Sequence, residues 1–280
     1  MKKIIFTLSC FIAVSTIAQV QIKEVYLQSG AFFGQTNSTL ADFQALVPNS
    51  SILQQDLSAY QNGSYLRFYG PGQSQSLNLG IGLAKLPNAT LRLGLMHVVQ
   101  NNALQTGGEY TESFAYDTLT SSQTGEQFFI DSFSSHGYWA RYSQKQLRLD
   151  ASLIFRYKAD KRWSFYGGIG ANFGLNYDAN TDVHQYTINY TGAELYGYAN
   201  GSTSEGTHLH ESFENKGGFG MSLYAPLGID FQVGKKREFW KPIHLYAELR
   251  PGVNINQIAG MGTSFSAGNF SNLGLRFQFK

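Results

Sequence analysis

The sequence alternates apolar and polar residues along eight separate stretches, and the charges within these stretches fall on the polar side of the alternation. In one stretch Leu147, Leu149 and Leu153 hold the odd positions, whereas Arg148 and Asp150 hold even ones. A period of two places successive side chains on opposite faces of a β-strand. A face that stays apolar over so many strands indicates contact with lipid, where a Lys or Arg costs about 2–4 kcal/mol at the bilayer midplane.

The connections between these stretches predict how the strands are arranged. The predicted strands cover residues 24–33, 75–85, 89–99, 146–157, 163–177, 218–234, 243–255 and 269–279, and the long connections cover 34–74, 100–145, 178–217 and 256–268. Short and long connections alternate strictly, which is typical of a barrel with brief periplasmic turns and large extracellular loops. We therefore predict an all-β fold, an eight-stranded antiparallel up-and-down transmembrane β-barrel with long extracellular loops. Wall strands at 127–133 and 183–190 would raise the count to ten or twelve.

The N-terminus has the features of a cleaved export signal. Lys2 and Lys3 precede an apolar core over 4–14, and small residues at Thr16 and Ala18 suit a cleavage site. We expect residues 1–18 to be a signal peptide and 19–280 to form the barrel in the outer membrane of a Gram-negative cell. Cys10, the only cysteine, lies in this signal, which excludes disulfides and thiolate chemistry from the mature chain.

Charge is distributed unevenly between the two predicted sides. The periplasmic side carries ten Lys and Arg against three acids, Glu24 among them, whereas the long loops carry thirteen Asp and Glu against four basic residues. The overall charge of +2 hides this asymmetry. The acidic loops are either a solvated surface or a surface that recruits cations or basic partners.

The inward-facing positions of the predicted strands contain both charges and glycines. The charged residues are Arg92, Arg148, Asp150, Arg156, Asp230, Glu248, Arg250 and Arg276. An eight-stranded barrel has room inside only for side chains, and glycines on this face should make space for arginines and tyrosines from the opposite wall. We expect an interlocked ionic network that closes the lumen. The alternative is a narrow path for small anions.

Aromatic residues mark both ends of the predicted strands, and the last strand ends in the alternating run Leu273 to Phe279. This end resembles the C-terminal signal that outer-membrane assembly machinery recognises. In length, signal peptide and Tyr-, Asn- and Gly-rich strands, the chain from about 24 to 280 resembles the small outer-membrane β-barrel proteins of Bacteroidota, similar in fold to the OmpA transmembrane domain and OmpX. The resemblance implies an outer-membrane location and a plugged barrel, and it implies no reaction.

The first two long loops contain apolar segments. Leu40, Phe43 and Val47 have helical spacing, and Ser38 or Thr39 could start a short helix that ends before Pro48. This helix would pack on its own hairpin or dock a partner. The second loop should continue its strands as a rigid hairpin, and its aromatic residues are either buried by neighbouring loops or exposed as a docking patch. The binding candidates there are Phe128, Phe129, Tyr138, Trp139 and Tyr142.

The third loop contains a possible metal site. His208 and His210 would face one side of a strand, within reach of a divalent cation such as zinc, with Asp182 and His184 in the same loop. The alternative is an ordinary polar loop.

An enzyme would need a catalytic group at the rim of the barrel. His97 has lipid-facing parity, but residues 98–102 lack the Arg-His-x-Ser-Asn pattern of lipid A deacylases. Asp178, Asp182 and His184 give only fragments of an omptin-like site. We therefore expect a non-enzymatic barrel without a cofactor, acting in binding or envelope integrity. Its partners would be outer-membrane lipid and lipopolysaccharide, and another outer-membrane or extracellular protein, but not nucleic acid.

Overall fold

The computed structural model describes residues 21–34, 38–61, 71–158, 161–195, 198–234 and 236–279. Its elements are β1 (Gln21–Gly34), α2 (Leu40–Leu46), β2 (Gly72–Leu83), β3 (Leu86–Thr120), β4 (Gln127–Tyr157), β5 (Trp163–Leu195), β6 (Tyr198–Glu214), β7 (Phe219–Tyr224), β8 (Leu227–Gln232), the 3-10 helix η2 (Glu238–Trp240), β9 (Ile243–Ile258) and β10 (Gly262–Gln278). The predicted signal peptide lies outside the described residues. In the described part of the chain, no helix is long and apolar enough to cross a membrane.

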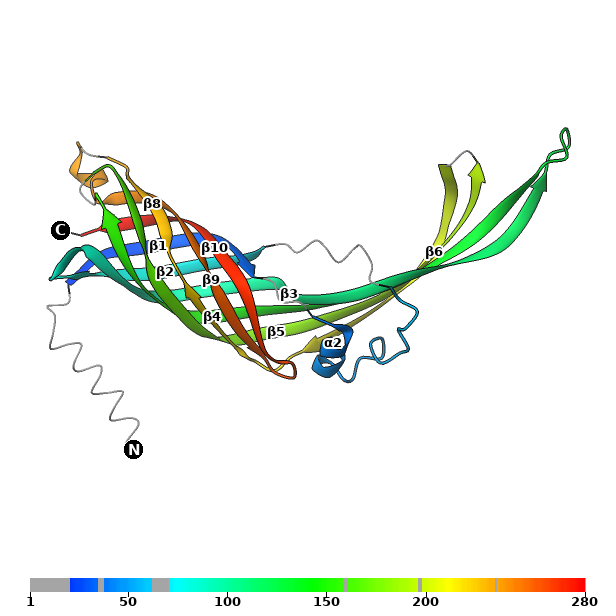
Figure 1. Ribbon diagram of the computed structural model, residues 1–280, viewed down its shortest axis with the longest axis horizontal. Helices are drawn as coiled ribbons and strands as arrows, with labels where there is room; N and C mark the ends of the chain where they lie inside the picture. Colours follow the sequence, from blue (N-terminus) through cyan, green and yellow to red (C-terminus); the bar gives the residue numbers. More distant parts are fainter. Residues whose placement is uncertain are drawn as a thin grey trace, which may run out of the picture.

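The strands close into a ring of eight in which all neighbours are antiparallel (Figure 1). The ring closes between β1 and β10, where Val25 is opposite Phe277. The predicted strand 218–234 is divided into β7 and β8, because Pro226 between them has no N–H to donate to a neighbouring strand. Both halves pair with β5 and β9, so together they form one wall strand. The predicted eight-stranded antiparallel barrel is confirmed.

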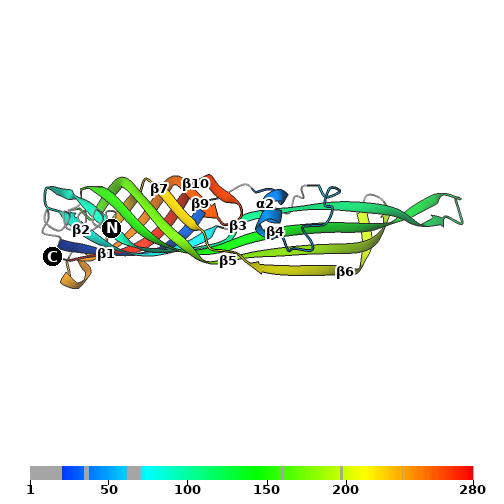
Figure 2. The same cartoon turned by 90° about the horizontal axis from the view of Figure 1, so that it is seen from below.

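Three wall strands continue far beyond the ring. β3, β4 and β5 contain 35, 31 and 33 residues, whereas β1 and β2 contain 14 and 12. Figures 1 and 2 show these strands projecting from one end of the barrel, with β6 added beside β5. We call this projecting part of β3, β4 and β5, together with β6, the projecting sheet. Residues 127–133 and 183–190 belong to it and add no strand to the ring.

One predicted long connection is instead a tight hairpin. We expected a loop over 256–268, but β9 and β10 pair up to Ile258 and Gly262. Gly260 and Gly262 have φ angles of 97° and 90°, which glycine adopts without a steric penalty. The sequence could not reveal this hairpin, because its strands are polar above the barrel and lose the clean alternation of the wall.

The helix α2 forms where the first loop was predicted to contain one. The hydroxyl of its N-cap Thr39 accepts from the Asp42 backbone N–H at 3.3 Å, and the Asp42 carboxylate accepts from the Thr39 backbone N–H at 2.8 Å. This reciprocal pair satisfies two N–H groups that the first helical turn leaves free. The helix lies against the projecting sheet close to the mouth of the barrel (Figures 1 and 2).

Candidate functional site

The charged residues predicted to face the lumen are all buried inside the ring. They are Arg92, Arg148, Asp150, Arg156, Asp230, Glu248, Arg250 and Arg276. Glu248 receives two arginines: Arg92 Nη1 lies 2.7 Å from one carboxylate oxygen, and Arg250 Nε donates to the other. Arg250 also pairs with Asp150 at 3.1 Å. These four residues link β3, β4 and β9 through one chain of ion pairs.

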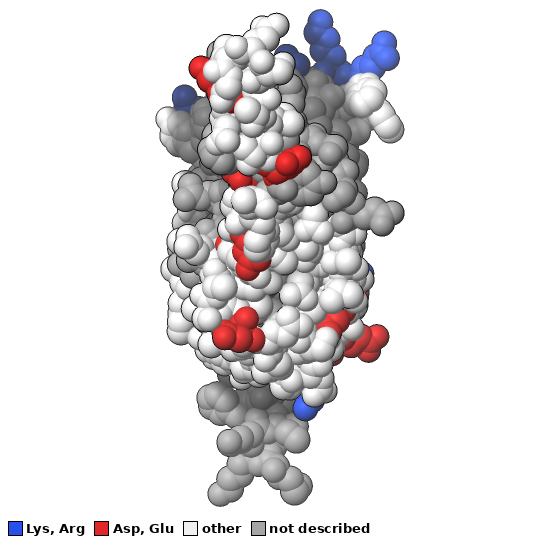
Figure 3. All heavy atoms as spheres, turned by 90° about the vertical axis from the view of Figure 1, so that its right-hand side faces the viewer, with Lys and Arg blue, Asp and Glu red and all other residues white. Residues whose placement is uncertain are grey.

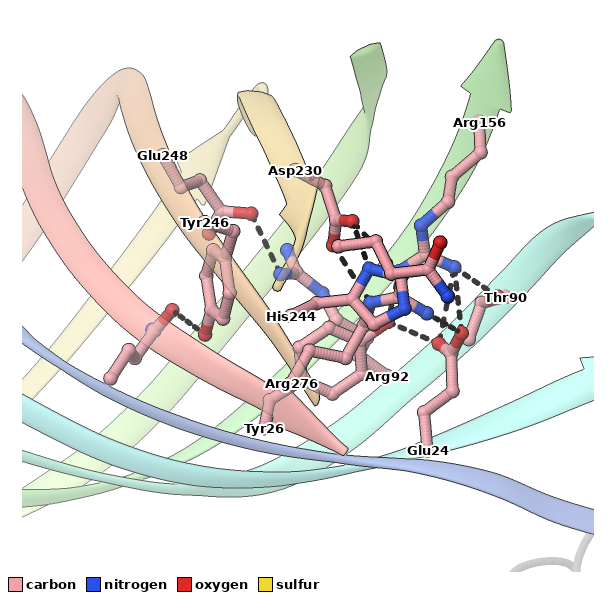
Figure 4. Close-up of polar contacts among 12 residues, drawn as sticks. Glu24, Tyr26, Thr90, Arg92, Arg156, Asp230, His244, Tyr246, Glu248 and Arg276 are labelled. Carbon is pink, nitrogen blue, oxygen red and sulfur yellow. Dashed lines mark hydrogen bonds and ion pairs between the residues drawn. The ribbon is translucent and has the colours of Figure 1, made fainter. Parts of the chain in front are cut away.

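A second ionic cluster is formed by residues near the strand ends that the short turns connect, and Figure 4 shows their side chains converging on one another. Arg276 bridges two carboxylates, with Nε 2.7 Å from Asp230 and Nη1 2.6 Å from Glu24. Arg156 Nη1 lies 3.0 Å from the same Glu24 carboxylate. His244 Nδ1 lies 2.6 Å from Asp230. Guanidinium groups that hold several carboxylate oxygens in this way form strong charge-assisted hydrogen bonds.

Two members of this second cluster, Glu24 and His244, were not among the residues expected in the ionic network. We expected Glu24 on the periplasmic surface, but it is 4% exposed and accepts from Arg156, Arg276 and Tyr26. Position 24 comes directly after Lys23 at the edge of the basic end, which favoured a surface assignment. Both residues hold even positions, the parity of the lumen, so the alternation itself could have identified them.

Arg148 departs from the expected interlocking of charges. Its side chain is fully buried, yet it forms no ion pair with a carboxylate in the described residues. Its guanidinium donates to neutral acceptors instead, at 2.6 Å to Gln146 Oε1 and 2.9 Å to both Asn172 and Ser222. The Asp150 carboxylate, two residues away, is held by Arg250 and Tyr224. Arg148 is thus a buried charge held by neutral groups, in a network that we expected to contain few unpaired charges.

The lumen glycines make room for side chains of the adjacent strand and not only of the opposite wall. Gly228 on β8 is the register partner of Tyr166 on β5. A Cβ atom added at Gly228 would lie 2.2 Å from Tyr166 Cζ, too close for any side chain. The glycine therefore lets the tyrosine ring lie flat along the inner wall.

Outside the ring, one face of the projecting sheet is covered by the segment 38–61. Phe43, Leu46 and Leu53 of this segment form a buried core with Tyr138 and Tyr142 of β4. Tyr138 is 6% exposed and Tyr142 is fully buried. For these two candidates the structure therefore shows burial by a neighbouring loop, one of the two alternatives left open for the aromatic residues of the second loop. Burial also raises the pKa of the Tyr142 hydroxyl to about 12. The side chains of Phe128 and Phe129 lie outside the described residues.

The opposite face of the projecting sheet is open and carries an aromatic and histidine cluster. Trp139 stacks on His184 at 3.7 Å between ring centroids, and His184 stacks on His210 at 4.2 Å. His184 Nδ1 lies 3.1 Å from His208 Nε2. Desolvation, with the nearby His210 and His208, lowers the pKa of His184 to about 4. We call Trp139, Arg141, Asp182, His184, His208 and His210 the histidine face.

A salt bridge borders this cluster. Arg141 Nη2 lies 3.1 Å from Asp182, and His210 Nε2 lies 3.6 Å from the same carboxylate. Partial burial would raise the pKa of Asp182, but hydrogen bonds from Arg141 and Ser212 outweigh this effect and lower it. In the part of the chain that the structure describes, no group of three or more His, Cys, Asp and Glu residues is arranged to hold a metal ion. The rings of His208 and His210 take different partners, His184 and Asp182 respectively, and a metal site at this pair stays a prediction.

The residues considered for catalysis at the rim are engaged in simple pairs. His97 Nε2 lies 2.6 Å from the Tyr177 hydroxyl on the outer wall. Asp178 accepts from Lys145 Nζ at 2.7 Å, and Asp182 is held by Arg141. None of these three pairs contains a serine or a cysteine beside a base.

Among known proteins, the chain is similar to solved structures, and the other two comparisons found no match. No protein-family model matches the chain, and no curated protein does. The chain is similar to Neisserial surface protein A, with 14% identity, a TM-score of 0.35, and 94% of this chain and 100% of the other covered. It is also similar to Ail, the attachment invasion locus protein of Yersinia pestis, crystallised with the heparin analogue sucrose octasulfate; identity is 12%, the TM-score 0.26, and coverage 92% and 100%. The evidence for the barrel is the pairing of strands within this chain.

Proposed function

We propose that this chain is a β-barrel of a Gram-negative outer membrane that spans the bilayer with its ring of eight strands. The support is an inside-out distribution of side chains: Leu149, Ile169 and Leu273 on the outer wall are 67%, 69% and 71% exposed, whereas charges are buried in the lumen. A continuous apolar surface of this kind is unfavourable in water and favourable against lipid. Exposed aromatic residues such as Trp163 and Tyr177 edge the apolar belt, as expected at membrane interfaces.

Two further parts of the proposal rest on the sequence. Export would use a cleaved signal peptide over 1–18, and the chain would belong with the small barrels of Bacteroidota that it resembles. Outer-membrane lipid, including lipopolysaccharide, would surround the apolar belt.

We propose that the lumen is closed to solutes. Arg92, Glu248 and Arg250 bond across the interior, and Tyr26, Tyr166 and Tyr246 fill the space beside them. Buried arginines and carboxylates that hold each other in this way are costly to separate, because each would be left as an unpaired charge. Planar-bilayer recordings of the purified protein should therefore show no steady conductance, and a stable open channel would contradict this part of the proposal.

We propose that the protein acts by binding a partner through the projecting sheet, and not by catalysis. The observation that carries this proposal is the buried core between the sheet and segment 38–61, centred on Phe43 and Tyr142. This core braces the sheet close to the mouth of the barrel, and the sheet continues from there as a platform (Figure 2). A preorganised surface loses little conformational freedom on binding.

The charge of the platform favours a partner with a basic surface. Figure 3 views the platform from its tip and shows Asp and Glu side chains spread along it. Glu109, Glu112 and Asp117 on β3 form no ion pair with any Lys or Arg of the described residues. Complementary charge would raise the association rate and make binding sensitive to salt.

A shortened variant tests the binding proposal. Residues 111–135 and 188–206 are each replaced by a tight turn, which retains the pairs Tyr110–His136 and Thr187–Thr207 and the whole core around Phe43. We expect this variant to fold, seen as an unchanged heat-dependent shift on gel electrophoresis, and to lose proteins that cross-link to the full-length chain in gently solubilised membranes. Recovery of the same cross-linked proteins from both forms would contradict binding through residues 111–135 and 188–206, the part of the projecting sheet farthest from the barrel.

A further inference from the structure

A cavity lies at the other end of the barrel, where the short turns gather, apart from the ionic lumen and the projecting sheet. It measures about 420 Å³ and is lined by Arg162, Gly234, Lys236, Arg237 and Trp240. Arg162 ends the connection between β4 and β5, and the other four belong to the connection between β8 and β9. Among the described residues of the lining, three are cationic and none is acidic.

Hydrogen bonds hold the two connections against each other. The Gln232 backbone N–H donates to the Arg162 carbonyl at 2.8 Å, and Arg162 Nε donates to the Gln232 carbonyl at 3.3 Å. The Arg162 guanidinium also lies 4.6 Å from the centre of the Phe231 ring, within the range of a cation–π contact. These two contacts restrain the guanidinium of Arg162, which stays exposed to solvent.

The opposite wall of the cavity is equally constrained. A Cβ atom added at Gly234 would lie 2.5 Å from Trp240 Cβ, so the indole is packed directly over the glycine backbone. The short helix η2 brings Trp240 back over the turn, with its backbone N–H donating to the Arg237 carbonyl at 3.0 Å. The packing of Trp240 on Gly234 therefore shapes one side of the cavity, and the side chains of Arg162, Lys236 and Arg237 form the rest of its lining.

The positive charge of the cavity is not neutralised by the described chain. Glu238 is the acid nearest in sequence, and it is held by Lys241 Nζ at 2.5 Å. Lys236 and Arg237 form no ion pair with any carboxylate among the described residues. Cationic side chains that converge on a cavity without an acid attract an anion.

We propose that this cavity binds the phosphate group of a glycerophospholipid in the membrane leaflet at this end of the barrel. Arginine presents a planar fork of donors that matches phosphate oxygens. Trp240 in the cavity wall is 41% exposed and the preceding residue, Phe239, is 70% exposed, the character of side chains at headgroup depth. Trp163 and Phe231, whose ring centroids are 4.5 Å apart, begin the apolar wall beneath it, where the acyl chains would lie.

This proposal rests on the proposed membrane location, and its test avoids the need for a bilayer. The probe is dihexanoyl-phosphatidylglycerol, added below its critical micelle concentration to the full-length protein in detergent, with binding followed by native mass spectrometry. The variant carries Lys236→Gln and Arg237→Gln. The control carries Lys23→Gln and Lys85→Gln, which remove the same charge from the same end of the barrel but outside the cavity.

We expect the cavity variant to bind the probe about 30-fold more weakly than the unmodified protein, from the usual contribution of two basic residues near a lipid phosphate, and the control to bind it unchanged.

An equal loss of probe affinity in the cavity variant and the control would overturn the assignment of binding to this cavity. Equal binding of dihexanoylglycerol, which lacks the phosphate, would overturn the assignment of the ligand class. Inorganic phosphate that binds as tightly as the lipid would overturn the lipid source. A conducting lumen or an unaltered set of cross-linked proteins would contradict the proposed function, but it would not change the measured binding of the lipid probe to the cavity.

Discussion

Tyr138 and Trp139 are consecutive residues of β4, and their side chains lie on opposite faces of the projecting sheet. Tyr138 packs edge-on against Tyr60 of the covering segment, with ring centroids 5.2 Å apart and planes at 78°. Trp139 stacks on His184 on the open face. One face is therefore closed by the protein itself, and the histidine face is the one that can meet a partner without unfolding segment 38–61.

Removal of the Phe43 side chain should loosen the packing of segment 38–61 on the covered face of the projecting sheet. Phe43→Ala deletes a fully buried ring from the core between α2 and the sheet, and such deletions cost about 3–5 kcal/mol. We expect faster hydrogen exchange at the amides of β4 and β5 beyond the ring, with exchange in the ring unchanged. Ala45→Ser, at an exposed position of the same helix, is the matched control. Unchanged exchange in the Phe43 variant would show that the sheet is rigid without its covering segment.

The ion pairs of Glu248 with Arg92 and Arg250 should contribute more to the stability of the folded barrel than to the closure of its lumen. Glu248→Ala leaves Arg92 and Arg250 buried, and breaking a buried ion pair by removing one partner costs about 3–5 kcal/mol. We expect a lower midpoint in urea unfolding from lipid vesicles and little conductance at neutral pH. Glu112→Gln, an exposed substitution of the projecting sheet, should leave the midpoint unchanged. A variant of normal stability that conducts would instead make Glu248 a gate.

The sequence predicted the ring well because a two-sided environment imposes a strict rule on each residue. Leu149 and Arg148 could be assigned to opposite faces without knowing any neighbour, since lipid and lumen differ so strongly in polarity. No such rule operates above the membrane. Whether Tyr138 or Trp139 is covered depends on where segment 38–61 packs, and that is a long-range contact which local pattern does not encode. The capping pair of Thr39 and Asp42 made α2 predictable, because a helix start is a local signal.

The same limit explains the charges of the lumen. Parity predicted that Arg148 and Arg276 would both face inward, and both do. It could not predict which arginine meets a carboxylate, because partners come from strands distant in sequence: Arg276 finds Glu24 and Asp230, whereas Arg148 finds only amides and a hydroxyl.

This difference predicts unequal effects of the same substitution. Arg276→Met removes the cation between two buried carboxylates and should cost about 3–5 kcal/mol. Arg148→Met leaves only neutral hydrogen-bonding groups without their donor and should cost about 1–3 kcal/mol. Unfolding of both variants in vesicles by urea gives the comparison. An equal or larger loss for Arg148→Met would mean that this guanidinium has an anionic partner in solution.

The projecting sheet should lose stability in acid through His184. Its pKa is about 4 in the folded protein and 6.5 in its ordinary state, because desolvation and the facing His210 and His208 disfavour the charged ring. Asp182 opposes this effect and Arg141 adds to it. The unfolded hairpin therefore binds the proton first, so stability is complete above about pH 6.5, falls as the pH drops toward 4, and levels off below.

Hydrogen exchange of the β5–β6 hairpin at pH 7.5 and pH 5, corrected for intrinsic rates, measures this loss. We expect protection to fall at pH 5 in the unmodified protein and to stay level in His184→Gln, which cannot take up the proton. His136→Gln is the control, since His136 lies on the same sheet and stacks on Tyr110, away from the histidine face. If His184→Gln and His136→Gln respond to acid alike, the titration belongs to another group, and the stacked rings of His184 and Trp139 play no part in the acid response of the platform.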